Sequence, residues 1–158
     1  AWSQVADPRL HLYLIGDPAT PFGRDVRALS QDHDRIHYLG YRNDVQRILP
    51  AFDAYALSSR REALGLSVIE AFAAELPVIA TAVGGVPEIV VPDQNGWLVP
   101  PENPVALADA IVRLAQAPGA ASQLARAGRS FYTEHLTDTR MVEQTLAVYQ
   151  RCLAATHP

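Results

Sequence analysis

The chain has 158 residues, a single cysteine and a formal net charge of -4 at pH 7. All 13 of its basic residues are arginine, so the sequence holds no lysine for a Schiff base or a P-loop and no clustered basic run of the kind that binds nucleic acid. No stretch approaches the ~18 consecutive apolar residues of a membrane span. The length suits one domain with a buried core, and the lone cysteine fits a reducing compartment.

The first forty residues predict two strands separated by a helix. Residues 1–6 resemble the tail of a helix, and neither an initiating Met nor a signal-peptide pattern stands before them, which indicates a piece of a longer chain. An apolar run at 10–15, closed by a Gly-Asp-Pro turn, predicts a buried strand. Pro21 is suited to begin a helix over 21–30, and a second strand is predicted over 35–39.

The middle of the chain continues the alternation of strands and helices. Asn43 or Asp44 is expected to cap a helix that runs to residue 52, and a third strand is predicted over 54–57. A short polar loop follows, then a thirteen-residue helix pattern that contains Glu70 and a strand over 77–81. A Gly-Gly turn, a short helix over 86–91 and a last strand over 96–99 complete this part.

Three helices are predicted after the last strand. Asn103 is expected to cap a helix that runs to about residue 117, where Pro118-Gly119 breaks it. Two more helices are predicted over 120–135 and 137–155.

These elements together predict an α/β fold with a doubly wound parallel sheet and extra C-terminal helices. The apolar runs of the strands are continuous rather than alternating, which is typical of strands covered on both faces. Ligands of such sheets bind at the carboxyl ends of the strands. The loops expected there contain Gly16-Asp17, Gly40-Tyr41-Arg42, residues 58–65 and residues 82–88.

Two glutamates stand out in these loops. Glu70 lies in a helix pattern that is apolar on nearly every side, so its carboxylate needs hydrogen-bond donors or a proton, and a sugar diol would serve. Glu62 lies eight residues earlier, at most ~12 Å away along a helix axis, so the pair would hold two ends of one elongated ligand. The alternative is structural: Glu62 complements a helix dipole and Glu70 is solvated or satisfied in the core. Spacing alone leaves both readings open.

The backbone between the two acids offers further ligand groups. Ala63, Leu64, Gly65 and Leu66 are expected to expose free N–H groups at a helix start, where a phosphate or a sugar hydroxyl is favoured. Gly65 would let a ligand approach the backbone closely.

Other chemistries find little support. The five histidines are scattered without metal-ligand spacing, so no metal site is predicted. No Gly-x-Ser-x-Gly follows a strand, and no Gly-x-Gly-x-x-Gly does, which disfavours a hydrolase and a nicotinamide or flavin domain.

The order of the motifs resembles the C-terminal, nucleotide-sugar-binding domain of GT-B glycosyltransferases, most closely the retaining group called glycosyltransferase family 4 (GT4). Its Glu-x7-Glu hallmark stands here as Glu62-Ala63-Leu64-Gly65-Leu66-Ser67-Val68-Ile69-Glu70. The other pieces in family order are LYLIGD at 12–17, HYLGYRNDV at 37–45, LPVIATAVGGVPEIV at 76–90 and NGWLVPPENPVALADAI at 95–111.

The resemblance implies a Rossmann-like domain over residues 1–158 that binds the donor, a nucleotide-diphosphate sugar. Glu70 would accept hydrogen bonds from the ribose, and Glu62, the catalytic candidate, would meet the hydroxyls of the transferred sugar. The N–H groups of Leu64, Gly65 and Leu66 would face sugar or diphosphate. The further donor-binding candidates are Ala63, Gly16, Tyr41, Arg42, Gly84 and Gly85, of which Tyr41 and Arg42 match the position of the base.

The implied reaction is transfer of the sugar with retention of configuration, through an oxocarbenium-like state, with no cofactor and no metal. The leaving diphosphate would help to deprotonate the acceptor, so charge stabilisation matters more than a protein nucleophile. The acceptor is undefined: a lipid-linked sugar, a polysaccharide or a small molecule. The resemblance implies a cytoplasmic protein, and many relatives act at the inner face of the membrane, although this chain shows no basic amphipathic helix for that role.

Departures from the family pattern limit what this chain is expected to do alone. Ala63 replaces the usual Gly, and the family's diphosphate-binding Gly-Arg and Lys belong to a central strand and loop upstream of this chain. The acceptor-binding N-terminal domain is also absent. We therefore expect a sheet without its middle strand and no turnover by the 158-residue chain alone. The alternatives are a catalytically silent nucleotide-sugar-binding or interaction lobe, and a GT-B type sugar-nucleotide epimerase.

Overall fold

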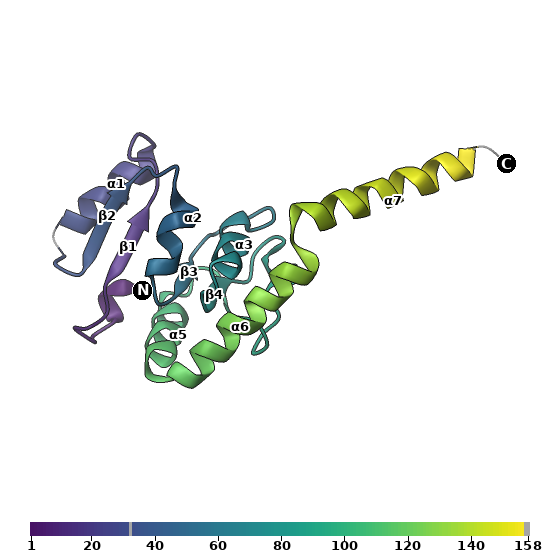
Figure 1. Cartoon of the computed structure of the whole chain (residues 1–158). Coiled ribbons are helices and arrows are strands. Elements are labelled where there is room, and N and C mark those ends of the chain that lie inside the picture. Colours follow the sequence, from purple (N-terminus) through teal and green to yellow (C-terminus); the bar gives the residue numbers. More distant parts are fainter. Residues whose placement is uncertain (32, 157–158) are drawn as a thin grey trace.

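The structure is a computed structural model that describes residues 1–31 and 33–156 (Figure 1). The strands are β1 (Leu12–Ile15), β2 (Ile36–Gly40), β3 (Tyr55–Leu57), β4 (Val78–Thr81) and β5 (Trp97–Val99). The α-helices are α1 (Pro21–Gln31), α2 (Val45–Ile48), α3 (Leu66–Ala73), α4 (Val86–Ile89), α5 (Pro104–Gln116), α6 (Pro118–His135) and α7 (Asp138–Thr156). Two short 3-10 helices, η1 (Trp2–Gln4) and η2 (Leu49–Ala51), complete the described elements.

All strand pairs are parallel, which confirms the predicted α/β class. The strands form two sheets: β1 pairs with β2, and β3, β4 and β5 pair in that order. Among the described residues no strand pairing joins the two sheets, and β1 lies nearer than β2 to the second sheet (Figure 1). That a middle strand belongs between them stays a prediction.

Strand β4 explains why the apolar runs in the sequence are continuous. All four of its residues are buried. Val78 and Ala80 pack into the cluster that contains α3 and α4, whereas Ile79 packs into the cluster that contains α5 and α6. Because successive side chains of a strand point to opposite faces, helices cover both faces of this sheet and no polar face is left.

Two predicted helices are shorter than expected. The helix expected up to residue 52 ends at Ile48, and Pro50 lies in the 3-10 segment η2 that follows. Asp44 occupies the N-cap position, but its carboxylate accepts hydrogen bonds from Arg42 and caps nothing. The thirteen-residue pattern folds as the eight-residue helix α3, which starts directly after Gly65 in the left-handed conformation, with φ +83°, and ends at Ala73.

The C-terminal helices follow the prediction more closely. The side chain of Asn103 accepts a hydrogen bond from the N–H of Ala106 at 3.0 Å, as expected for the cap of α5. Helix α5 ends at Gln116, as predicted, and Pro118 then occupies the first turn of α6, where its missing N–H costs nothing. Residues 1–6, expected to be a helix tail, form only the 3-10 turn η1.

Helix α7 extends away from the rest of the molecule (Figure 1). Leu146 and Tyr149 are 52% and 61% exposed along it. In the described part of the chain, no helix is long and apolar enough to cross a membrane.

Helix α6 lies close against α3 at Gly128. A Cβ atom at this position would lie 2.5 and 2.8 Å from two ring carbons of Phe72, a fully buried side chain. The close approach of the two helices therefore depends on the missing side chain.

We predict that Gly128→Ala lowers the free energy of unfolding by about 1 kcal/mol. Overpacking a core costs ~1–3 kcal/mol, which outweighs the ~1 kcal/mol that alanine gains over glycine inside a helix. Urea denaturation would measure the change. Gly119→Ala is the matched control, since nothing lies within 4 Å of a Cβ there, and it should leave stability unchanged or raise it. Equal curves for the two variants would contradict this packing.

Candidate functional site

The loop that carries Glu62 is tied to the end of β4. The hydroxyl of Thr81, a 4% exposed side chain, donates a hydrogen bond to the carbonyl of Ser59 at 2.7 Å. The hydroxyl of Ser59 in turn donates to the Glu62 carboxylate at 3.4 Å. The buried strand thus places Glu62 at the carboxyl ends of β3 and β4.

The Gly-Gly turn packs directly on this loop. The N–H of Gly85 donates to the carbonyl of Ala63 at 2.9 Å. Gly84 has a positive φ of +54°, and a Cβ there would overlap the carbonyl oxygen of Glu62. Gly84 and Gly85 therefore lie beside Glu62 and Ala63, and the space available explains why both are glycine.

Gly65 closes the loop and begins α3. Its carbonyl accepts hydrogen bonds from the N–H groups of Val68 and Ile69. A Cβ at Gly65 would lie 3.3 Å from Val86 and 3.5 Å from Ile89 of α4. The left-handed turn and the packing against α4 give a structural reason for glycine here, and its predicted close approach to a ligand stays a prediction.

The start of α3 leaves backbone donors available. Within residues 1–31 and 33–156, the N–H groups of Leu64, Gly65 and Leu66 donate no hydrogen bond. The first N–H groups of a helix have no partner inside the helix, and the helix dipole adds partial positive charge there.

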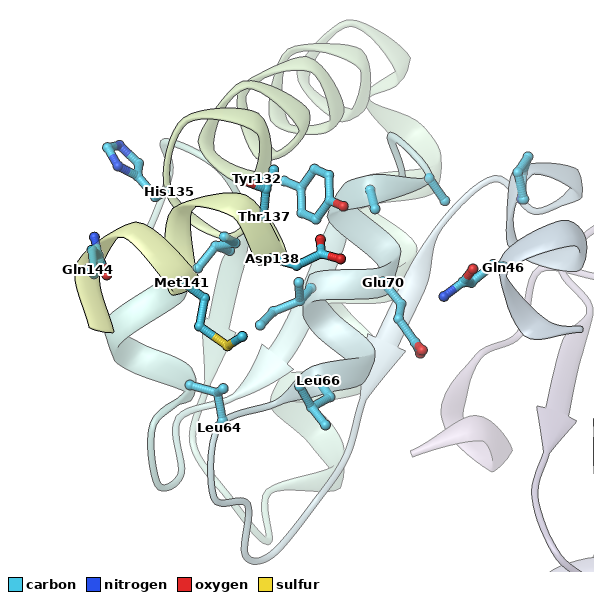
Figure 2. Close-up of a pocket in the computed structure, with 15 residues that line it drawn as sticks. Gln46, Leu64, Leu66, Glu70, Tyr132, His135, Thr137, Asp138, Met141 and Gln144 are labelled. Atoms are coloured by element: carbon cyan, nitrogen blue, oxygen red, sulfur yellow. The ribbon is translucent and has the colours of Figure 1, made fainter. Parts of the chain in front are cut away.

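Glu70 lies on the wall of a cleft of about 720 Å³ (Figure 2). The cleft runs between α3, the α2–η2 segment and the junction of α6 with α7. Its lining comprises Gln46, Pro50, Leu64, Leu66, Ile69, Glu70, Ala73, Ala74, Tyr132, His135, Leu136, Thr137, Asp138, Met141 and Gln144. Glu70 is partly exposed and makes no hydrogen bond or ion pair through its side chain with the described residues. Its carboxylate is thus available to a ligand.

Tyr55 shows that the two acids belong to one neighbourhood. Its side chain comes from β3 and packs against the core cluster that contains α3. Burial raises the pKa of the phenol, the charges of Glu62 and Glu70 raise it further, and a hydrogen bond with Ser67 opposes them. Glu70 lines the cleft and Glu62 does not.

The other predicted residues lie at the carboxyl ends of β1 and β2. The N–H of Gly16 donates to the carbonyl of Gly40 at 3.0 Å, and the hydroxyl of Tyr38 donates to the carbonyl of Gly16 at 2.8 Å. Tyr41 is 72% exposed. These residues form a second group, apart from the acid loop, and helix α2 leads from them to the Glu70 cleft.

Arg42 is held in an ion pair rather than free to meet a ligand. Its guanidinium donates two hydrogen bonds of 2.8 Å to the carboxylate of Asp44. The hydrogen bonds from Arg42 lower the pKa of Asp44, and the same contact raises the pKa of Arg42.

Sequence reasoning missed four residues that shape the site: Gln46, Tyr55, Ser59 and Thr81. Thr81 is the one polar residue that ends an otherwise apolar strand, which was an available signal. Gln46 and Tyr55 gave none, because their importance depends on where α2 and β3 lie relative to α3. Across the described residues, no three His, Cys, Asp or Glu side chains are grouped to hold a metal ion.

We predict that Tyr55 titrates above the usual pKa of a tyrosine. Glu62→Gln and Glu70→Gln should each lower that pKa, because each removes a negative charge that disfavours the phenolate. NMR titration of labelled tyrosine would measure it, with Tyr55→Phe to assign the signal. Glu75→Gln is the control, an exposed acid beyond the far end of α3. A Tyr55 pKa unmoved by both site variants would contradict the shared neighbourhood.

Comparison of the chain with known proteins identifies its family. The family described as "Glycosyl transferases group 1" matches residues 1–117. The D-inositol 3-phosphate glycosyltransferase of Jonesia denitrificans is 32% identical over 97% of this chain and 38% of its own length. The N-acetyl-alpha-D-glucosaminyl L-malate synthase of Bacillus anthracis is 28% identical over 92% of this chain and 38% of its own length.

Solved structures agree with the sequence comparison. Sucrose-phosphate synthase from Thermosynechococcus elongatus is 31% identical, with a TM-score of 0.85 over 98% of this chain and 41% of that protein. Anabaena HepE in complex with UDP is 25% identical, with a TM-score of 0.84 over 91% of this chain and 42% of that protein. The chain thus spans about two fifths of the length of these relatives. It has the Rossmann-like fold of a GT-B C-terminal domain and belongs to the group 1 (GT4) glycosyltransferase family.

Proposed function

We propose that this chain is the donor-binding domain of a retaining glycosyltransferase that uses a nucleotide-diphosphate sugar. The observation that carries the proposal is the carboxylate of Glu70, which lines a cleft on an apolar helix without a hydrogen-bond partner among the described residues. A partly buried carboxylate of this kind is stabilised by hydroxyl donors, and a ribose diol supplies two.

The donor lies between the two acids in this proposal. Glu70 accepts hydrogen bonds from the ribose, and Glu62 accepts them from the hydroxyls of the transferred sugar. The free N–H groups of Leu64, Gly65 and Leu66 lie between the acids in sequence and meet the diphosphate or the sugar. Ala63, Gly84 and Gly85 form the neighbouring wall, which their mutual backbone contacts support.

The base is assigned to the loops after β1 and β2. Gly16 borders them, and Tyr41 and Arg42 contact the base through their backbone. The ion pair between Arg42 and Asp44 supports this, because it occupies the guanidinium and leaves the main-chain groups of Arg42 to contact the base.

Catalysis rests on positioning and charge rather than on a protein nucleophile. Backbone donors and the start of α3 stabilise the negative charge that grows on the leaving diphosphate. That diphosphate then helps to remove the proton of the acceptor, which another domain binds. The chain contains no lysine, so any lysine contact to the diphosphate comes from outside these 158 residues.

Related proteins support the donor class. HepE has been solved with UDP and with UDP-glucose, and the first of these structures is 25% identical to this chain. The names of two relatives mention different molecules, L-malate in one and D-inositol 3-phosphate in the other. We therefore propose only the class of the donor, a nucleotide-diphosphate sugar. The acceptor binds to another domain in this proposal.

One rival function has an observation in its favour. A catalytically silent nucleotide-sugar-binding lobe is favoured by Ala63, which stands where the family usually has glycine. Both functions share donor binding and differ in turnover.

We predict that one nucleotide among UDP, GDP, ADP and CMP raises the melting temperature of this chain, and that Glu70→Gln abolishes the increase. The substitution keeps the shape of the side chain but removes the charged acceptor, whose hydrogen bonds are worth ~1.5–3 kcal/mol, or about 10- to 150-fold in Kd. Thermal-shift and calorimetric titrations would measure both effects.

Glu75→Gln is the matched control, because it makes the same chemical change just outside the site, and it should bind like the unaltered chain. Flat melting curves with every nucleotide, or full binding by Glu70→Gln, would contradict the proposed function. Sugar transfer by the 158-residue chain alone would contradict the assignment of the acceptor site to another domain.

A further inference from the structure

A second polar side chain faces Glu70 from across the cleft. Gln46 comes from α2, and its amide points toward the Glu70 carboxylate in Figure 2. No hydrogen bond joins the two side chains, and neither has another side-chain hydrogen-bond partner among the described residues. The cleft therefore holds an acceptor on one wall and an amide on the other, with space between them.

Gln46 is the only side chain on its wall that can hydrogen-bond. The α2–η2 segment contributes two residues to the lining, Gln46 and Pro50, and proline has no polar side-chain atom. The α3 wall around Glu70 is otherwise apolar, with Leu66, Ile69 and Ala73. On these two walls Gln46 and Glu70 are the polar side chains, and the other polar lining comes from the α6–α7 junction, with Tyr132, Thr137 and Asp138.

The two side chains are chemically complementary to a vicinal diol. An ionised carboxylate only accepts hydrogen bonds, whereas an amide donates two through its NH2 group and accepts through its oxygen. A hydroxyl that donates a hydrogen bond to Glu70 still has lone pairs, and these can accept a hydrogen bond from the NH2 group of Gln46. Two apolar or two acidic walls would leave those lone pairs without a donor.

We propose that Gln46 is a specificity-determining residue that closes a ribose clamp with Glu70. This inference rests on the proposed function and deepens it: the clamp selects ribonucleotides over deoxyribonucleotides. A deoxyribose lacks a hydroxyl, so one of the clamp's polar groups loses its partner on binding and pays the cost of desolvation.

The test compares ribose and deoxyribose ligands on Gln46→Leu. Calorimetric titration of UDP, 2′-deoxy-UDP and 3′-deoxy-UDP gives three Kd values for each protein. We expect Gln46→Leu to weaken UDP binding by about 3- to 10-fold, the size of one neutral hydrogen bond. We also expect the ratio of Kd for at least one deoxy ligand to Kd for UDP to fall toward one, which general damage to the fold would not produce.

Gln123→Leu is the matched control. It makes the same substitution on α6, at an exposed side chain that does not line the cleft, and it should change neither affinity nor ratio. If Gln46→Leu keeps the ratio of the unaltered chain while Glu70→Gln loses UDP, the clamp is overturned and the donor site stands. If the unaltered chain binds another of the four nucleotides instead of UDP, the same comparison uses that nucleotide and its deoxy forms. If it binds none of UDP, GDP, ADP and CMP, both proposals are overturned.

Discussion

The hydrogen bond from Thr81 to the carbonyl of Ser59 joins the buried core to the acid loop. Thr81 is buried at the end of β4, and among the described residues its hydroxyl donates only to the carbonyl of Ser59. The hydroxyl of Ser59 in turn donates a hydrogen bond to the Glu62 carboxylate. Gly84 and Gly85 pack against the same loop at Glu62 and Ala63. A mobile loop could carry the same residues, but it would not hold an acid at a defined place beside the sheet.

The sequence was sufficient for the architecture because the strongest patterns belong to the core. Strand β4 and helix α5 were predicted almost to the residue, since a continuous apolar run and an Asn cap are local signals. That a middle strand belongs between the two sheets was expected from family resemblance rather than from any local pattern, and it stays a prediction. The helix at 43–52 was predicted too long, because the pairing of Arg42 with Asp44 competes with capping and Pro50 favours a tighter turn.

The site was only partly predictable, because it depends on contacts between elements far apart in sequence. Glu62 and Glu70 could be singled out from their neighbours in the chain. That Tyr55 lies near both acids, and that Gln46 faces Glu70, depends on how α2 and β3 lie relative to α3. The packing of Gly65 against α4 likewise gives that glycine a structural reason that its neighbours in the chain did not show.

The roles proposed for the acids and the open N–H groups share one claim: a nucleotide binds at the start of α3 and in the cleft beside it. NMR mapping of the 15N-labelled chain during titration with UDP, GDP, ADP and CMP in turn tests that claim most directly. The account predicts that the largest shifts belong to the amides of Leu64, Gly65, Leu66 and Glu70 and to the side-chain NH2 group of Gln46. Saturable shifts confined to the surface of α5 and η1, or no shifts at all, would contradict it.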